Sequence, residues 1–183
     1  MKKITERIVS LLHSRNNPLR AAFLFGFAGL SSWMPVFNIW LEDQGLKGSQ
    51  IGFIAAIPWV VMLIVQPLWG VLADRYGKMQ CLKISIISAA LIFSLFPLLG
   101  KGIIPITFIT IVLALFNNPV LPLLDSIALD QIDRSQNISY SNIRFWGAPG
   151  YALGAVVTGW LIPVLGINVA FYTSAVFLVL CLL

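Results

Sequence analysis

The stretch that decides the fold is NNPVLPLLDSIALDQIDRSQNISYSNIRFWGAPGY, residues 117–151, in which charged and amide side chains interrupt long apolar segments. Residues 103–124 before Asp125 and residues 145–166 after Arg144 contain no other formal charge. Burying an ion in hydrocarbon costs several kcal/mol, so such an ion persists only when it is paired or faces a wet cavity. The stretch therefore predicts a helical membrane bundle that lines a polar cavity.

The spacing of Asp125 and Arg144 predicts that they meet. If a polar loop runs from about residue 130 to 139, each residue lies roughly 7 Å inside its own helix. Tyr151 follows Arg144 by two helical turns, which predicts nearly the same face and a position about 10 Å deeper. The three residues would then form one wall of the cavity. The alternative is that Asp125 and Arg144 only neutralise each other as a structural salt bridge near the membrane surface.

The composition of the whole chain also indicates an integral membrane protein. Among 183 residues, 58% are apolar and 10% are charged, whereas a soluble domain has roughly 25% charged residues. The mean hydropathy is +0.90. The net charge of +5 is interpreted as a topology signal rather than a nucleic-acid surface. Cys81 and Cys181 lack the spacing of a metal or redox motif, so no disulfide and no metal site are expected.

Two regions are expected, a cytoplasmic amphipathic segment over residues 1–19 and a transmembrane bundle over residues 20–183. Six apolar spans are expected, at about 20–41, 50–73, 80–100, 103–128, 140–165 and 168 to the end. Ten of the twelve basic residues fall in the N-terminus and the even loops or at the span ends beside them, namely Lys2, Lys3, Arg7, Arg15, Arg20, Arg75, Lys78, Lys83, Arg134 and Arg144. Only Lys47 and Lys101 fall in the odd loops, which predicts a cytoplasmic N-terminus.

The last span stops at Leu183 after about 16 residues, which is short for a crossing, so a fragment of a longer protein is expected. Two motifs recur between the halves of the chain: Pro35-Val36 matches Pro119-Val120, and the eleven-residue spacing of Pro58 and Trp69 matches that of Pro149 and Trp160. Three crossings separate the matches. They predict two inverted three-helix repeats, with coincidence as the alternative.

The most specific motif is GVLADRYGK, residues 70–78. Gly70 permits close approach of another backbone, and Gly77 can adopt a positive φ in a tight turn. Asp74 can accept from a neighbouring helix N-terminus or pair with Arg75. The alternative is an ordinary basic turn between two spans.

The GVLADRYGK run resembles the loop signature of the major facilitator superfamily. MPVFNIWLED and YSNIRFWGAPGYALGA resemble its lactose-permease-like branch of sugar and nucleoside proton symporters. The resemblance implies the N-terminal six of twelve helices. It also implies a conformational gate that includes Gly70, Asp74, Arg75, Gly77 and Lys78.

The resemblance further implies a substrate site in which Arg144 holds substrate hydroxyls, Asp125 partners it and Tyr151 stacks on a sugar ring. These roles fit a guanidinium fork, a carboxylate acceptor and an aromatic face. Tyr151 replaces a tryptophan and Asp125 a longer glutamate, so lactose itself is not implied.

Other polar and small residues inside the spans have mainly structural interpretations. Gly150 with Gly154, and Ala155 with Gly159, are expected at close helix contacts. Pro119, Pro122 and Pro149 are expected to bend their helices. Asn118 is expected to be structural, whereas Asn117 is equally compatible with structure and with substrate binding.

The expected function is secondary transport of a small polar solute, a sugar or nucleoside, across the cytoplasmic membrane by proton symport. The partners would be the lipid bilayer, the solute and a C-terminal six-helix half, or a second copy if the chain is half-size. No cofactor other than the proton gradient and no nucleic acid are expected. The alternatives are a drug or metabolite efflux antiporter and a non-transporting structural or receptor subunit. An enzyme is not expected, because the chain has no nucleophile elbow and no zinc-binding helix motif.

Overall fold

Every regular element in the described part of the chain is a helix. The computed structural model describes residues 17–98, 102–134 and 139–183, so the predicted amphipathic segment lies almost wholly outside it. Five helical runs are long and apolar enough to cross a membrane, and one shorter apolar helix follows them. They are Pro18–Asp43, Gly48–Tyr76, Lys78–Leu98, Ile103–Ile132 and Tyr140–Leu165, followed by Val169–Leu180. The predicted all-helical membrane fold is confirmed, with span boundaries within a few residues of those expected.

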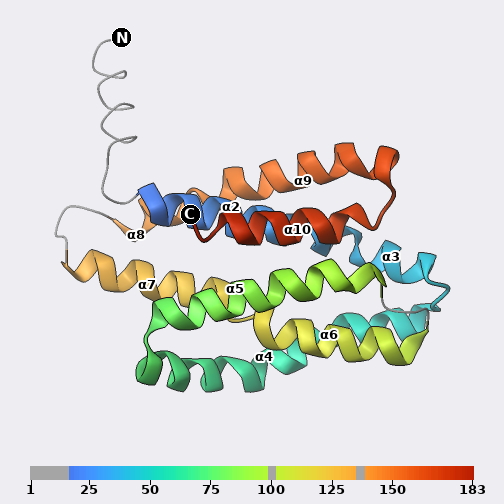
Figure 1. The fold of residues 1–183 in the computed structure, drawn as a ribbon, viewed down its shortest axis with the longest axis horizontal. Helices are drawn as coiled ribbons and strands as arrows, with labels where there is room; N and C mark the ends of the chain where they lie inside the picture. The colour runs from blue at the N-terminus through green and yellow to red at the C-terminus, as the bar shows by residue number, and fades with distance from the viewer. Residues whose placement is uncertain (1–16, 99–101, 135–138) are drawn as a thin grey trace, which may run out of the picture.

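Several of these runs are interrupted, so they comprise more helices than spans (Figure 1). Pro35 lies in a short 3-10 segment that divides the first span, and the turn at Asn118 and Pro119 divides the fourth. The helices are α2 (Asn17–Trp33), α3 (Phe37–Asp43), α4 (Gly48–Tyr76), α5 (Lys78–Leu95), α6 (Ile103–Asn117), α7 (Val120–Arg134), α8 (Tyr140–Arg144), α9 (Gly147–Leu165) and α10 (Val169–Leu180).

Proline explains the division at residues 118–119, because it has no amide hydrogen and its ring clashes with the preceding turn. The expected bend at Pro119 is therefore confirmed as a break between α6 and α7. Pro149 instead lies in the first turn of α9, where its missing amide hydrogen costs no helical bond.

α2 packs against both α9 and α10 (Figure 1). Gly150 and Gly154 of α9 lie against the backbone of α2, where an added Cβ would overlap Leu24 and Ala28. This confirms the expected close contact at that glycine pair. A Cβ at Gly159 would meet no atom within 4 Å, so the second small-residue pair is not a contact within the described helices.

A buried aromatic cluster joins the first span to α5 and α10. The rings of Phe96 and Phe171 stack with centroids 4.6 Å apart, and Trp40 packs edge-on against both. The indole of Trp40 also donates to Asn168 Oδ1 at 2.7 Å. These contacts hold one end of the bundle together through apolar burial and edge-to-face ring geometry.

Candidate functional site

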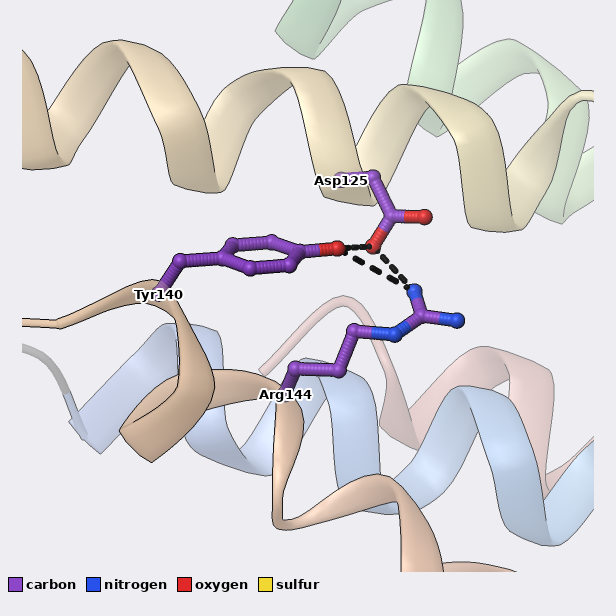
Figure 2. Close-up of polar contacts among 3 residues, drawn as sticks. All are labelled: Asp125, Tyr140 and Arg144. Atoms are coloured by element: carbon purple, nitrogen blue, oxygen red, sulfur yellow. Dashed lines mark hydrogen bonds and ion pairs between the residues drawn. The ribbon is translucent and has the colours of Figure 1, made fainter.

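Three polar side chains from two helices meet in a cluster inside the bundle (Figure 2). Tyr140 Oη donates to Asp125 Oδ1 at 2.7 Å, and Arg144 Nη1 forms a hydrogen-bonded ion pair with the same oxygen. Arg144 Nη1 also lies 3.3 Å from Tyr140 Oη. We call Asp125, Tyr140 and Arg144 the charged cluster. The predicted meeting of Asp125 and Arg144 is confirmed.

The local sequence explains how the charged cluster forms. Tyr140 and Arg144 are four residues apart in α8, so both side chains lie on one face of that helix. Ile143 is buried in the core, and α8 packs against both α2 and α7. Tyr140 was not among the residues predicted from the sequence, although its four-residue spacing from Arg144 is visible there.

The charged cluster is partly open and keeps unused hydrogen-bonding atoms. The Arg144 and Asp125 side chains are 41% and 30% exposed. Within the described residues, only one terminal nitrogen of the guanidinium and one carboxylate oxygen are engaged. Arg144 also faces the rings of Phe23 and Phe27, at 6.0 and 5.5 Å from their centroids. The cluster can therefore offer further donors and an acceptor to a polar solute.

Asn117 lies away from the charged cluster, in a pocket of about 210 Å³ between α2, α3, α4 and α6. We call this cavity the amide pocket. The amide of Asn118 donates to the Pro58 carbonyl at 2.8 Å, which confirms the expected structural role of Asn118. Asn117 forms no side-chain hydrogen bond with any described residue. The polar and aromatic lining residues are Trp33, Phe37, Asn38, Trp59, Asn117 and Asn118.

Tyr151 is part of neither the charged cluster nor the amide pocket. It lies in α9, is 39% exposed and forms no hydrogen bond within the described part of the chain. The expectation that it shares a face with Arg144 assumed one continuous helix. Residues 145 and 146 form a turn between α8 and α9, so the two residues belong to separate helical segments.

The predicted gating loop forms a tight turn between α4 and α5. Gly77 has φ +92°, the left-handed region that favours glycine. Lys78 Nζ forms an ion pair with Asp130 Oδ2 of α7 at 2.6 Å, and the Arg75 guanidinium lies 5.4 Å from the centre of the Tyr76 ring. Asp74 is exposed and has no partner in the described structure, so neither of the two predicted contacts of its carboxylate occurs here.

Gly70, Asp74 and Lys78 also line a second cavity of about 220 Å³ between α4 and α7. A Cβ at Gly70 would meet no described atom within 4 Å. The predicted close approach of another backbone at Gly70 therefore does not occur within the described bundle. No group of three His, Cys, Asp or Glu side chains that could hold a metal occurs in the described ranges.

The comparisons with known proteins agree with this architecture. The model of the MFS_1 like family matches residues 17–183. The chain belongs to the major facilitator superfamily. Members of this superfamily are membrane carriers and not enzymes, which agrees with the apolar helical runs described above.

The relatives of this chain are named for different activities. The chain is 31% identical over 151 residues to a maltose permease of Geobacillus stearothermophilus, covering 82% of this chain and 38% of that protein. It is 32% identical over 142 residues to the uncharacterized transporter YwbF of Bacillus subtilis, covering 77% and 35%. It is 27% identical over 165 residues to the multidrug resistance protein MdtG of Dickeya zeae, covering 87% and 40%. The chain thus spans less than half the length of these relatives.

Proposed function

We propose that this chain is the N-terminal six-helix part of a secondary transporter that imports a small polar solute, a sugar or nucleoside, by proton symport. It would lie in the cytoplasmic membrane with its N-terminus inside the cell. The observation that supports substrate binding most directly is the charged cluster. Asp125, Tyr140 and Arg144 are held together, yet they keep a second guanidinium nitrogen and a second carboxylate oxygen for a ligand.

A C-terminal half is proposed as the partner of this bundle. Only 11% of the most apolar part of α4 is buried within the described bundle. The buried share is 17% for the Tyr140–Leu165 run, which contains α9, and 50% for the first span. Large apolar faces of this kind mark contact with lipid or with another protein surface. Rocking of the two halves around a midplane site would give alternating access, and the proposed inverted three-helix repeats would supply its symmetry.

The exposed Asp74 is proposed to act in this movement. Its carboxylate is unpaired within the described bundle and could accept from a helix N-terminus of the other half in one conformation. The Lys78–Asp130 ion pair meanwhile ties α5 to α7. The gating residues Gly70, Asp74, Arg75, Gly77 and Lys78 would then stabilise one of two states. The proton-coupling groups are proposed to lie mainly outside this chain.

Efflux is the second candidate, because a 27% identical relative is named a multidrug resistance protein. A non-transporting structural or receptor subunit is the third. Reconstitution of the full-length protein in proteoliposomes separates them. Import predicts that an inward proton gradient drives radiolabelled sugar or nucleoside into the lumen against its concentration gradient. Proton-driven movement of a lipophilic cation in the opposite direction would favour efflux, and absence of any solute flux would favour the third candidate.

A further inference from the structure

The amide pocket is separate from the charged cluster and has its own polar groups. Asn117 precedes Asp125 by eight residues, which is about 12 Å along a helix axis, and the turn at residues 118–119 lies between them. α2, α3 and α4 provide the other walls. The charged cluster therefore does not account for the chemistry of this cavity.

The pocket contains hydrogen-bonding groups that no described residue satisfies. Asn38 and Asn117 each offer an amide donor and a carbonyl acceptor. The side-chain amide of Asn118 donates to the Pro58 carbonyl. This bond fixes the orientation of the amide and leaves its side-chain oxygen as an acceptor. Trp33 is 8% exposed, and its indole N–H is buried without an acceptor in the described structure. An unmet buried donor is costly, so an acceptor beside it would stabilise the site.

The pocket has aromatic walls and no charge. Trp59 is 62% exposed and presents its ring, while Trp33 is held edge-on against Phe37 with centroids 5.2 Å apart. None of the lining residues is acidic or basic. A cationic ligand would therefore find no carboxylate there, and an anionic ligand no cation. A neutral ring with hydroxyl groups would satisfy the amides and place its C–H face on an indole.

The size of the cavity limits the ligand to a small group. Its volume of about 210 Å³ is below the roughly 300 Å³ at which typical drug-sized sites begin. We propose that the amide pocket is a binding subsite for one uncharged polyhydroxylated ring, a glycosyl unit, recognised by Asn38, Asn117 and the Trp59 face. This inference rests on the proposed transport function and narrows its substrate to a neutral saccharide.

Calorimetry on the purified full-length protein tests the subsite. The probes are a panel of neutral mono- and disaccharides, including maltose, and tetraphenylphosphonium as a cation of comparable bulk. At least one saccharide is expected to bind, and Asn117→Ala or Trp59→Ala is expected to raise its Kd tenfold or more. Trp160→Ala is the matched tryptophan control, because Trp160 is 82% exposed on α9 and outside the pocket. Its Kd should stay within twofold of wild type.

A protection experiment locates the ligand without relying on a loss of affinity. A saccharide that binds should slow the reaction of Met34→Cys with a thiol reagent, because Met34 lines the pocket and is 43% exposed, and should leave Lys47→Cys unaffected. The native Cys81 and Cys181 are buried and give a low background. The subsite is overturned if no saccharide binds, if folded Asn117→Ala and Trp59→Ala both keep wild-type affinity, or if Met34→Cys is unprotected.

These experiments distinguish failure of the proposed transport function from failure of the proposed subsite. Proton-driven uptake of a nucleoside by a protein that binds no saccharide would overturn the subsite and leave symport intact. Saccharide binding without any flux would leave the subsite intact and overturn transport. Preferential binding of tetraphenylphosphonium in the amide pocket would contradict both.

Discussion

Arg144 is the residue whose geometry best distinguishes a substrate-binding role from a purely structural one. One of its terminal nitrogens is engaged by Asp125 and Tyr140, and the other has no partner in the described structure. Lysine would keep the charge but lose the planar fork. We expect Arg144→Lys in the full-length protein to weaken substrate binding by about 2 kcal/mol or more, the scale of a lost charged hydrogen bond. Calorimetric titration with the transported solute measures this change.

The double variant Asp125→Asn with Arg144→Gln is the companion test, because it leaves no unpaired charge in the cluster. If the pair is only structural, the double variant should fold and bind normally. Normal affinity with a wild-type melting curve would refute a binding role for this pair.

Tyr140 provides a test of the cluster as a hydrogen-bonded unit. Phenylalanine keeps the ring but removes the donor to Asp125 Oδ1. We expect Tyr140→Phe to lower the free energy of unfolding by about 1 kcal/mol, the usual net value of one such bond, as measured by denaturant titration in detergent. Tyr172→Phe is the matched control, because Tyr172 is 40% exposed on α10 and forms no hydrogen bond within the described chain. An equal effect of both changes would contradict the assignment.

At the scale of the elements, the α2–α9 contact depends on glycine. An added Cβ at Gly154 would overlap the Ala28 backbone, whereas one at Gly159 in the same helix meets open space. Close backbone approach is a main source of helix association in membranes. We therefore expect Gly154→Val to lower the melting temperature by several degrees or to prevent folding. Gly159→Val should do neither, and equal tolerance in a thermal melt would show that α9 can move away from α2.

Asp74, near the turn between α4 and α5, is expected to affect the rate of transport. Asp74 has no partner in the described bundle, so its removal should cost little stability within this half. If it anchors one state through the other half, Asp74→Asn should slow initial transport severalfold and leave substrate Kd nearly unchanged. Lys78, which is already paired with Asp130, gives a contrasting variant, Lys78→Gln, whose effect should include a small loss of stability. Parallel loss of rate and affinity in Asp74→Asn would place Asp74 in folding or binding instead.

Sequence patterns predicted the elements well because long apolar runs bounded by charges have few alternatives in a bilayer. The helix break at Pro119 and the meeting of Asp125 with Arg144 also followed from local rules. The position of the turn at residues 145–146 was not predicted, although a bend was expected at Pro149, whose ring disfavours a helical turn that includes Phe145. That turn determines where Tyr151 lies relative to Arg144, which local spacing alone could not give.

At the scale of the whole molecule, the polar groups fall into two places rather than one wall. The charged cluster involves residues close in sequence, and spacing arguments could find two of its three members. The amide pocket joins residues from positions 30 to 118, and only the packing of α2, α3, α4 and α6 brings them together. Sequence periodicity shows which face of a helix is polar, but it does not show which other helix that face meets. Asn117 was therefore identified without its partners.

The orientation of the bundle in the membrane is predicted from its charge asymmetry. Lys47 precedes α4 at one end of the bundle, whereas Arg75, Lys78 and Lys83 gather at the other end, around the turn between α4 and α5. Basic residues are retained on the cytoplasmic side. In whole cells, an impermeant thiol reagent should label Lys47→Cys and spare Arg134→Cys, and permeabilisation should make Arg134→Cys reactive. The buried Cys81 and Cys181 should contribute little, which the unsubstituted protein controls. Reversed labelling would place the Gly77 turn outside the cell, where it could not act in the proposed cytoplasmic gate.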